Sequence, residues 1–444
     1  MRRRVDDSWT GKLGRMYLDP FEDQRNLEKR RARSITFQVT EGCNLCCSYC
    51  YQGAKSNKRM TLETGKRIMD MILSGDERIS AYMPTNEIAG VAFDFIGGEP
   101  FLEIDLIDGI MDYFVERAFE MDHPLANKYM ISMSSNGTLY FTEPVQKFIE
   151  KWKNHLSLSI SVDGNKKLHD ACRVFADGTG SYDMAIKAAM YHREHYGFIG
   201  SKMTIAPGNV EYTYEAVDEM LKNGYREIFL NCVFEEGWTI AHAKILYQQL
   251  KKLADRLLAM DEEAYLSIFD DWIGRKISEE DNQNWCGGTG AMLAFDPDGN
   301  AYPCLRYMPS SMNGQREPYT IGNLNDGIGI TEADAAKVKA LNEITRRSQS
   351  TDECWNCPIA SGCAWCSGYN YQKFGTPNKR ATFICVMHRA RVLANCYYWN
   401  MLYIKNGSPE RFPLDIPEEW GREIAGNDYD MLKELAEVKA NGSN

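Results

Sequence analysis

The strongest constraint on the fold is a repeated alternation of strand-like and helix-like segments that begins at Ser34. Successive strand–helix units predict a parallel sheet with right-handed crossovers. Six units predict the α/β class and a partial (β/α)6 barrel of the TIM type, with active residues at the C-terminal ends of the strands. The strand-like runs are SITFQVT, VAFDFIGG, YMISMSSNG, LSLSISVDG, KMTIAPGN and EIFLNCVF. The helices are expected to begin near Leu62, Ile104, Pro144, Tyr182, Tyr212 and Thr239.

The remaining sequence is divided by changes in composition. After residue 285 the chain becomes rich in Cys, Gly and Trp, which predicts a small domain held together by metal rather than by a large apolar core. One helix is expected near Tyr429 to Lys439, in an otherwise polar tail. The expected segments are an N-terminal extension (1–33), the barrel (34–240), a helical connector (241–284), the small domain (285–400) and the tail (401–444).

Composition limits the possible function classes. The chain has 444 residues, of which 44% are hydrophobic and 25% charged, an ordinary globular balance. No apolar run reaches the roughly 20 residues that span a bilayer, and no secretory signal follows the charged N-terminus, so we expect no membrane partner. The formal net charge of -11 argues against a nucleic-acid partner.

Fourteen cysteines are the unusual feature of this composition. Without a secretory signal we expect a cytoplasmic, reducing or anaerobic environment, where disulfides are rare. Cysteines at short spacings then indicate metal or cluster ligation, whereas scattered ones are more often core residues.

The first cysteine group lies in GCNLCCSYCYQG, directly after the first strand. Cys43, Cys47 and Cys50 have the spacing C-x3-C-x2-C, and three thiolates can hold three irons of a [4Fe–4S] cluster. The fourth iron then remains free to chelate a small molecule. A zinc site is the alternative, although structural zinc prefers four ligands. Tyr49 is placed to shield the cluster, and Cys46 fits neither spacing.

This loop resembles the signature of the radical S-adenosylmethionine (SAM) superfamily. The resemblance implies that the open iron binds the amino and carboxylate groups of SAM. An electron from the cluster then cleaves the sulfonium, and a 5′-deoxyadenosyl radical abstracts a hydrogen atom from the substrate. The cofactor supplies this chemistry, and the protein supplies position and exclusion of water.

The ends of the next strands extend the resemblance. The second strand ends in Gly97, Gly98, Glu99 and Pro100, which resemble the GGEP motif that meets the SAM amino group. The glycines permit the backbone to approach a ligand closely, and a carboxylate accepts a bond from an ammonium group.

Further SAM contacts are implied at later strand ends. Asn136, Ser161 and Asp163 are candidates for the SAM pocket, although such residues are also common in turns and caps. Arg173, in LHDACRV, is implied to pair with the SAM carboxylate; a surface salt bridge is the alternative.

A second cysteine region resembles the SPASM domain of peptide-modifying radical SAM enzymes, which holds two auxiliary [4Fe–4S] clusters. Its seven cysteines are Cys286, Cys304, Cys354, Cys357, Cys363, Cys366 and Cys385. By position, Cys354, Cys357, Cys363 and Cys385 are implied to hold the outer cluster, and Cys286, Cys304 and Cys366 the inner one. The family usually has three residues between the cysteines that are Cys363 and Cys366 here, where two occur.

Two fully ligated [4Fe–4S] clusters need eight thiolates, so seven cysteines leave one iron without a cysteine ligand from the chain. Our hypothesis is that a substrate cysteine takes this position as its thiolate. The alternatives are Cys396, a water molecule or another oxygen ligand.

The resemblance covers roughly residues 34–400 and implies three [4Fe–4S] clusters, SAM, and a flavodoxin- or ferredoxin-type electron donor. It predicts a radical SAM oxidoreductase that matures a cysteine-containing precursor peptide (a RiPP maturase), forming a thioether crosslink. No individual catalytic residue is assigned.

Two other functions remain open. The first is an anaerobic sulfatase-maturating, formylglycine-forming enzyme, but Leu305 follows Cys304 where such enzymes usually carry an aspartate. The second is a multi-cluster electron-transfer protein, which would not need a three-cysteine site, GGEP or a pocket arginine.

Overall fold

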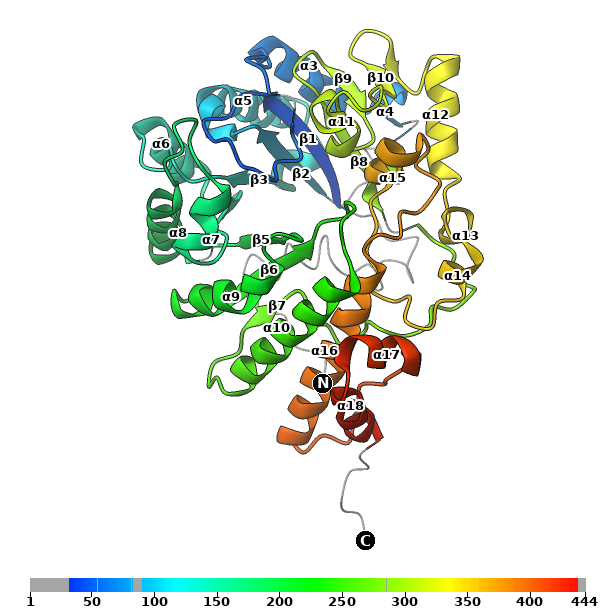
Figure 1. Cartoon of the computed structure of the whole chain (residues 1–444). Helices are drawn as coiled ribbons and strands as arrows, with labels where there is room; N and C mark the ends of the chain where they lie inside the picture. Colours follow the sequence, from blue (N-terminus) through cyan, green and yellow to red (C-terminus); the bar gives the residue numbers. More distant parts are fainter. Residues whose placement is uncertain are drawn as a thin grey trace.

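The computed structural model describes residues 32–437 except positions 54, 81, 83–89, 198 and 285. Parallel strands follow one another around a central space, and helices lie outside them (Figure 1). These strands are β1 (Ala32–Thr40), β2 (Gly90–Gly97), β3 (Tyr129–Ser135), β4 (Leu156–Ile160), β5 (Ser201–Ile205) and β6 (Glu227–Cys232).

The strand order matches the chain order. β1 to β4 pair in parallel within one sheet, and β5 pairs in parallel with β6 in another. A parallel bridge between Ser159 and Gly200 connects β4 to the start of β5. β6 does not return to β1, so the barrel stays open and the predicted partial barrel is confirmed.

A helix follows each strand, beginning at or next to the residue that the sequence predicts. Side-chain caps explain two of these starts: Thr61 accepts from the Thr64 amide at 3.0 Å, and Thr239 caps the last helix through His242. The helices are α3 (Leu62–Leu73), α4 (Glu77–Ser80), α5 (Ile104–Glu120), α6 (Glu143–Trp152), α7 (Lys166–Cys172), α8 (Tyr182–Tyr196), α9 (Thr213–Lys222) and α10 (Ile240–Leu258).

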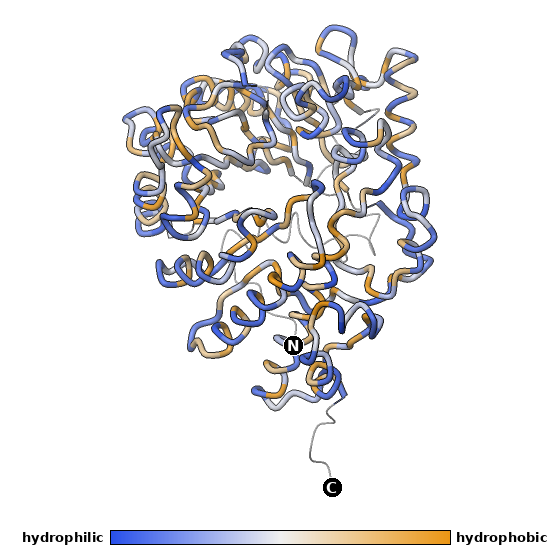
Figure 2. Tube along the Cα trace, in the orientation of Figure 1, coloured by the Kyte–Doolittle hydropathy of each residue, from blue (hydrophilic) through white to orange (hydrophobic). Residues whose placement is uncertain are grey.

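Alternation along the strands separates the apolar core from the barrel interior. Phe37, Phe93 and Phe95 are fully buried, and Phe93 meets Phe114 of α5 at 4.7 Å between ring centroids. Burying each such ring contributes about 1.5–3 kcal/mol. The intervening positions of β1 and β2 include polar residues such as Asp94, so polar groups face the side of the sheet opposite the helices. Figure 2 shows apolar segments inside and polar segments on the outer helices.

The C-terminal domain extends the barrel sheet through β8. β8 (Met292–Phe295) pairs in parallel with the free edge of β1, and β9 (Asn300–Tyr302), β10 (Gly322–Asn323) and β11 (Gly327–Ile328) continue the sheet in antiparallel fashion. The helices of this region are α11 (Pro309–Met312), α12 (Glu332–Asn342), α13 (Arg346–Gln349), α14 (Asp352–Trp355), α15 (Ser367–Phe374) and α16 (Cys385–Lys405).

The predicted helical connector over 241–284 is wrong beyond Leu258, where α10 ends. Tyr265–Leu266 instead form β7, which pairs in parallel with β6. The Tyr265 amide donates to the Arg226 carbonyl at 2.7 Å and the Ser267 amide to the Ile228 carbonyl at 3.0 Å. This segment therefore forms a strand because the unpaired edge of β6 offers it backbone hydrogen bonds.

The predicted polar tail is part of the packed structure. α17 (Glu418–Ala425) and α18 (Asp428–Glu437) pack against α10 and α16, and α18 corresponds to the helix expected near Tyr429. Lys251 of α10 forms a 2.7 Å ion pair with Asp428, and Leu432 is fully buried. The N-terminal extension up to residue 31 and residues 438–444 lie outside the described residues.

If α18 supports the fold, Leu432→Ala will lower the free energy of unfolding by about 2–5 kcal/mol, because it leaves a cavity beneath the helix. Glu434→Ala, on the exposed side of the same helix, is the matched control and will change stability by no more than about 0.5 kcal/mol. Anaerobic urea denaturation followed by circular dichroism measures both, and equal effects would contradict the packed position of α18.

Candidate functional site

The first cysteine loop lies between the C-terminal end of β1 and α3. Its backbone is tied to the segment after β4: the Cys46 amide donates to the Val174 carbonyl at 2.7 Å, and the Ser48 amide to the Cys172 carbonyl at 3.0 Å. Within the loop, the Cys50 amide donates to the Cys47 carbonyl at 3.2 Å. These bonds fix the loop across the open end of the barrel.

The three predicted ligands of this loop are free, half-buried thiols, whereas Cys46 is exposed. Burial raises the pKa of Cys43 to about 11 and also raises the pKa of Cys47. The charges of neighbouring thiolates add to both shifts, Cys47 acting on Cys43 and Cys50 on Cys47. The three thiols are therefore close enough in space for the charge of one to affect the pKa of its neighbour.

Gly98 is required by the cysteine loop, and Gly97 by Thr40 at the end of β1, whose carbonyl oxygen would lie 2.8 Å from a Gly97 Cβ atom. A Cβ atom on Gly98 would lie 2.2 Å from the Gly42 carbonyl oxygen and 2.7 Å from the Cys43 Cβ. The Gly98 amide donates to the Thr40 carbonyl at 3.1 Å, and the Glu99 amide to the Gly42 carbonyl at 2.9 Å. The close backbone approach that the sequence predicts is therefore made to the loop itself.

The Glu99 carboxylate is almost fully buried beneath this loop. Its Oε1 accepts from the Ser135 hydroxyl at 2.7 Å and from the Phe101 amide at 3.0 Å, and its Oε2 accepts from the Asn136 amide at 2.8 Å. Burial raises the pKa of Glu99, and these three donors oppose that shift. Pro100 opens a short 3-10 helix directly after it. The arrangement aims a fixed carboxylate at the loop.

Asn136 contacts the cysteine loop through its side chain. Its Nδ2 donates to Asn44 Oδ1 at 2.8 Å, and its Oδ1 accepts from the Thr138 amide at 2.9 Å and hydroxyl at 2.7 Å. Asn44 in turn donates to the Thr138 hydroxyl at 2.8 Å. Sequence reasoning missed Asn44 and Thr138, because neither belongs to a recognisable motif.

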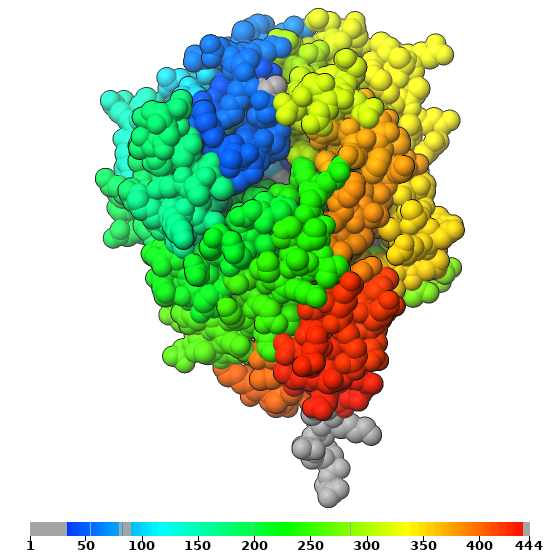
Figure 3. Space-filling view, in the orientation of Figure 1, coloured from blue at the N-terminus to red at the C-terminus, as the bar shows by residue number. Residues whose placement is uncertain are grey.

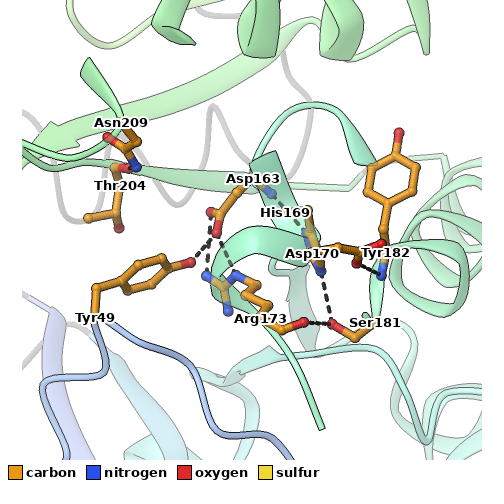
Figure 4. A network of polar contacts seen from close by, with 9 residues as sticks. All are labelled: Tyr49, Asp163, His169, Asp170, Arg173, Ser181, Tyr182, Thr204 and Asn209. Atoms are coloured by element: carbon orange, nitrogen blue, oxygen red, sulfur yellow. Dashed lines mark hydrogen bonds and ion pairs between the residues drawn. The ribbon is translucent and has the colours of Figure 1, made fainter. Parts of the chain in front are cut away.

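Asp163, Arg173 and Tyr49 form a buried polar group beside the loop (Figure 4). Arg173 Nε donates to Asp163 Oδ2 at 2.7 Å, and the Tyr49 hydroxyl donates to the same oxygen. The Arg173 guanidinium also lies 5.3 Å from the Tyr49 ring centroid. The negative charge of Asp163 raises the pKa of Arg173 further above its usual value, so the guanidinium stays charged.

His169 contacts the backbone of Asp163 and, through Ser181, the backbone of Arg173. Its Nδ1 accepts from the Asp163 amide at 3.2 Å, and its Nε2 lies 3.0 Å from the Ser181 hydroxyl, which donates to the Arg173 carbonyl at 2.9 Å. His169 is fully buried, and burial lowers its pKa to about 4. Ser161, the remaining predicted contact, is half-buried, and its amide donates to the Ser135 carbonyl at 2.8 Å.

The cysteines predicted for the outer cluster are close in space. Burial raises the pKa of Cys385 to about 12, and the charges of Cys363 and Cys354 add to the shift. Cys363 and Cys354 act on Cys357 in the same way. Four thiols from α14, the following loop and the start of α16 therefore share one region.

The cysteines predicted for the inner cluster also meet. A Cβ atom on Gly288 would lie 3.1 Å from Cys304 Sγ and 3.7 Å from Cys286 Sγ. Burial raises the pKa of Cys304 well above its usual value, and the charges of Cys366 and Cys286 add to the shift.

Cys396, one alternative for the open position, lies elsewhere. It is fully buried in α16, where its thiol lies 3.8 Å from the Leu432 carbonyl of α18 and accepts from Asn400 Nδ2 at 3.5 Å. The structure therefore makes Cys396 part of the core between these helices.

The cysteines of these groups form no disulfides, since all fourteen cysteines of the chain are free thiols. Within the described residues, no three or more His, Cys, Asp or Glu side chains are arranged to hold one metal ion.

Comparison with known proteins identifies the barrel. Residues 37–250, from β1 into α10, match the family model described as the Radical SAM superfamily. The chain contains a radical SAM domain.

Curated relatives extend this similarity. An uncharacterized protein of Methanocaldococcus jannaschii is 29% identical over 44% of this chain and 61% of its own length, less than two thirds. The cysteine-type anaerobic sulfatase-maturating enzyme of Clostridium perfringens is 23% identical over 74% of this chain and 87% of that enzyme. The antilisterial bacteriocin subtilosin biosynthesis protein AlbA of Bacillus subtilis is 22% identical over 77% of this chain and 69% of AlbA.

A solved structure supports the fold of both domains. Native anSMEcpe with bound AdoMet and the Cp18Cys peptide has a TM-score of 0.61 and 17% identity, over 84% of this chain and 98% of that one. At this identity the likeness shows the fold alone. The resemblance of this radical SAM protein to maturases of peptides or proteins comes from its curated relatives, the sulfatase-maturating enzyme and AlbA.

In the part of the chain that the structure describes, no helix has the length and apolarity that crossing a bilayer requires.

His169 predicts a specific pH dependence of stability. Its pKa is about 4 in the folded chain and near 6.5 when unfolded, so between these values the unfolded state binds more protons. The stability that it contributes is present above pH 6.5 and is lost as pH falls toward 4, by up to about 1.4 kcal/mol per pH unit. His169→Gln will show a shallower decline than the wild type when urea denaturation is measured between pH 7 and 5. The exposed His195→Gln is the control; identical slopes for all three proteins would contradict the buried, neutral imidazole.

Proposed function

We propose that this chain is a radical SAM peptide maturase that reductively cleaves SAM and abstracts a hydrogen atom from a cysteine-containing peptide, forming a thioether crosslink. The observation that carries the proposal is the grouping of Cys43, Cys47 and Cys50 above the buried Glu99 carboxylate, beside Asp163 and Arg173. When bound, a [4Fe–4S] cluster and SAM supply the radical chemistry that removes hydrogen from a substrate.

The chain's own residues bind and orient SAM in this proposal. Glu99 Oε2 has only one donor among the described residues, the Asn136 amide, so it retains capacity to accept from the SAM ammonium group. Asn136 positions the cysteine loop through Asn44. Ser161 and Asp163 line the next strand end, where we place the rest of the SAM pocket.

Arg173 is proposed to bind the SAM carboxylate while Asp163 holds its Nε. Arg173 Nη2 also lies 3.5 Å from Asp163 Oδ1. A guanidinium has five N–H donors, so an ion pair through Nε and Nη2 still leaves others for a second carboxylate. Tyr49 lies beside this guanidinium and helps to exclude water from the cluster.

The peptide site is proposed to lie between the cysteine loop and the inner cysteine group. Tyr51 follows Cys50 directly, keeps 41% of its surface exposed, and lies 5.7 Å beneath the Arg306 guanidinium. The segments that surround this space, near residues 50, 235 and 365, meet on one face of the molecule (Figure 3).

The inner and outer cysteine groups are proposed to hold two auxiliary [4Fe–4S] clusters, for three in total. Cys396 is packed beneath α18, so it does not fill the open position of the inner group. We propose that a substrate cysteine thiolate takes this position; a water molecule or another oxygen ligand is the alternative. Metal coordination would deprotonate and orient that sulfur. Spectroscopy of the inner cluster with and without peptide tests this; an unchanged signal would reject it.

The sulfatase-maturating function is the alternative, favoured by the 87% of that relative's length that the alignment covers. Against it, the residue after Cys304 is Leu305, where such enzymes usually carry an aspartate. The next residue, Arg306, is a cation that pairs with Glu235 at 3.1 Å and does not replace this carboxylate. The products differ, because a thioether retains sulfur and loses two hydrogens, whereas converting cysteine to formylglycine removes sulfur. Mass spectrometry of the SAM-treated peptide distinguishes them.

A one-electron donor of the flavodoxin or ferredoxin type is proposed as the partner that supplies the reducing electron. Fourteen free thiols agree with a reducing, anaerobic cytoplasmic environment.

Cysteine variants test the division of labour between the groups. Cys50→Ala will abolish 5′-deoxyadenosine formation from SAM under reducing conditions, because it removes one ligand of the SAM-binding cluster. Cys363→Ala will retain some uncoupled SAM cleavage but yield no modified peptide. Cys46→Ala, an exposed thiol of the same loop, is the control and will retain cleavage. Chromatography of 5′-deoxyadenosine measures SAM cleavage by all three variants. Equal rates of SAM cleavage by Cys50→Ala and Cys363→Ala would contradict the assignment of the two cysteines to different clusters.

Glu99→Gln tests the SAM contact. The variant keeps the side-chain volume but removes the charge, so we expect SAM to bind about 10- to 100-fold more weakly. Glu103→Gln, in the same turn but paired with Arg59 at 2.9 Å, will bind SAM normally. Calorimetry with reconstituted protein measures both affinities, and an unchanged affinity of the Glu99 variant would refute this contact.

A further inference from the structure

Buried donors without partners gather around the inner cysteine group. Within the described residues, Tyr82 Oη, Tyr307 Oη, Arg306 Nε and Asn284 Nδ2 are buried atoms with no hydrogen-bond partner. Each belongs to the surroundings of Cys286, Cys304 or Cys366. The charges of Cys304 and Cys286 act on both tyrosines, and that of Cys366 acts on Arg306. The Asn284 Oδ1 accepts from the Cys286 amide at 3.0 Å.

Tyr307 is the most tightly placed of these donors. It is fully buried at the end of the 3-10 helix Leu305–Tyr307, which follows Cys304 directly. Its ring atom Cε2 lies 3.4 Å from the point that a Gly288 Cβ would occupy, and this point is 3.1 Å from Cys304 Sγ. The ring packs at centroid distances of 5.4 Å from Tyr319 and 5.9 Å from Tyr371. The ring that carries the hydroxyl is thus fixed close to Cys304.

An unsatisfied hydroxyl at such a position is costly. Burying a hydroxyl without an acceptor is unfavourable, and the Tyr307 hydroxyl is buried without one among the described residues. Burial also raises the pKa of Tyr307 well above the usual value, so the hydroxyl keeps its proton and can donate it. An anionic group held by the three neighbouring cysteines would be a matching acceptor.

We propose that the Tyr307 hydroxyl donates a hydrogen bond to a sulfur of the inner auxiliary cluster. The inference rests on the inner cluster of the proposed function. Hydrogen bonds to cluster sulfurs influence the reduction potential, because they stabilise the more negative, reduced state. Tyr307 is therefore a positioning and tuning residue that raises the potential of the inner cluster.

Tyr307→Phe tests the inference because it removes only the oxygen and keeps the ring. Tyr319→Phe is the matched control, since Tyr319 belongs to the same aromatic group but donates to the Lys337 carbonyl at 3.4 Å. The measurements are a redox titration followed by electron paramagnetic resonance, and proton ENDOR before and after exchange into D2O. We expect the potential of the inner cluster to shift negative and an exchangeable proton coupling to disappear in Tyr307→Phe alone.

A potential and a proton coupling unchanged from those of Tyr319→Phe would overturn the inference. Iron and acid-labile sulfide analysis shows first that both variants carry the wild-type cluster content. Cys304→Ala identifies the inner-cluster signal, because alanine carries no atom that can bind iron and the variant lacks one inner ligand. If Cys304→Ala loses no iron and no signal, the inner cluster of the proposed function fails. If that signal is present but insensitive to Tyr307, only the present inference fails.

Discussion

The candidate site depends on the contact between the cysteine loop and the end of β2. Gly98 brings its backbone so close to Gly42 that no larger residue fits, and the Glu99 amide then bonds the Gly42 carbonyl. The same turn places the Glu99 carboxylate beneath the loop, where Ser135 and the Asn136 amide fix both of its oxygens. Three strand ends therefore meet in one small volume, which is what a parallel arrangement makes possible.

The second constraint is the open edge of the barrel. Because β6 does not pair with β1, one edge of β1 has no partner within the barrel. β8 pairs with this edge and forms its backbone hydrogen bonds. An uncovered edge would be a site for aggregation, so the C-terminal domain protects the sheet while it adds its own cysteines. This pairing also places Cys304, two residues after β9, close enough to the first loop to affect the pKa of Tyr51, which follows Cys50.

Much of this organisation is local and could be read from the sequence. The strands, the helix starts and the spacing of Cys43, Cys47 and Cys50 depend on neighbouring residues and on caps such as Thr61. The grouping of the later cysteines came from resemblance to a known domain, and the structure brings the same sets together. Their role as cluster ligands, like that of the SAM contacts, stays a prediction.

Other features depend on partners far away in the chain. β7 forms because β6 offers an unpaired edge. The tail packs because Lys251 of α10 pairs with Asp428, and because Cys396 of α16 contacts Leu432 of α18. No local pattern shows that Asn136 will bond Asn44, or that Asp163 will hold Arg173 through Nε. Such contacts depend on tertiary packing, so the pattern of helices and strands alone does not predict them.

The central claim is that three thiolates present one iron of a cluster to SAM. Binding of SAM labelled with 15N at its amino group, followed by ENDOR of the reduced protein, tests this most directly. A 15N coupling to the cluster that is absent in Cys50→Ala is the predicted result. A reconstituted cluster that shows no coupling to the labelled amino group would contradict the account.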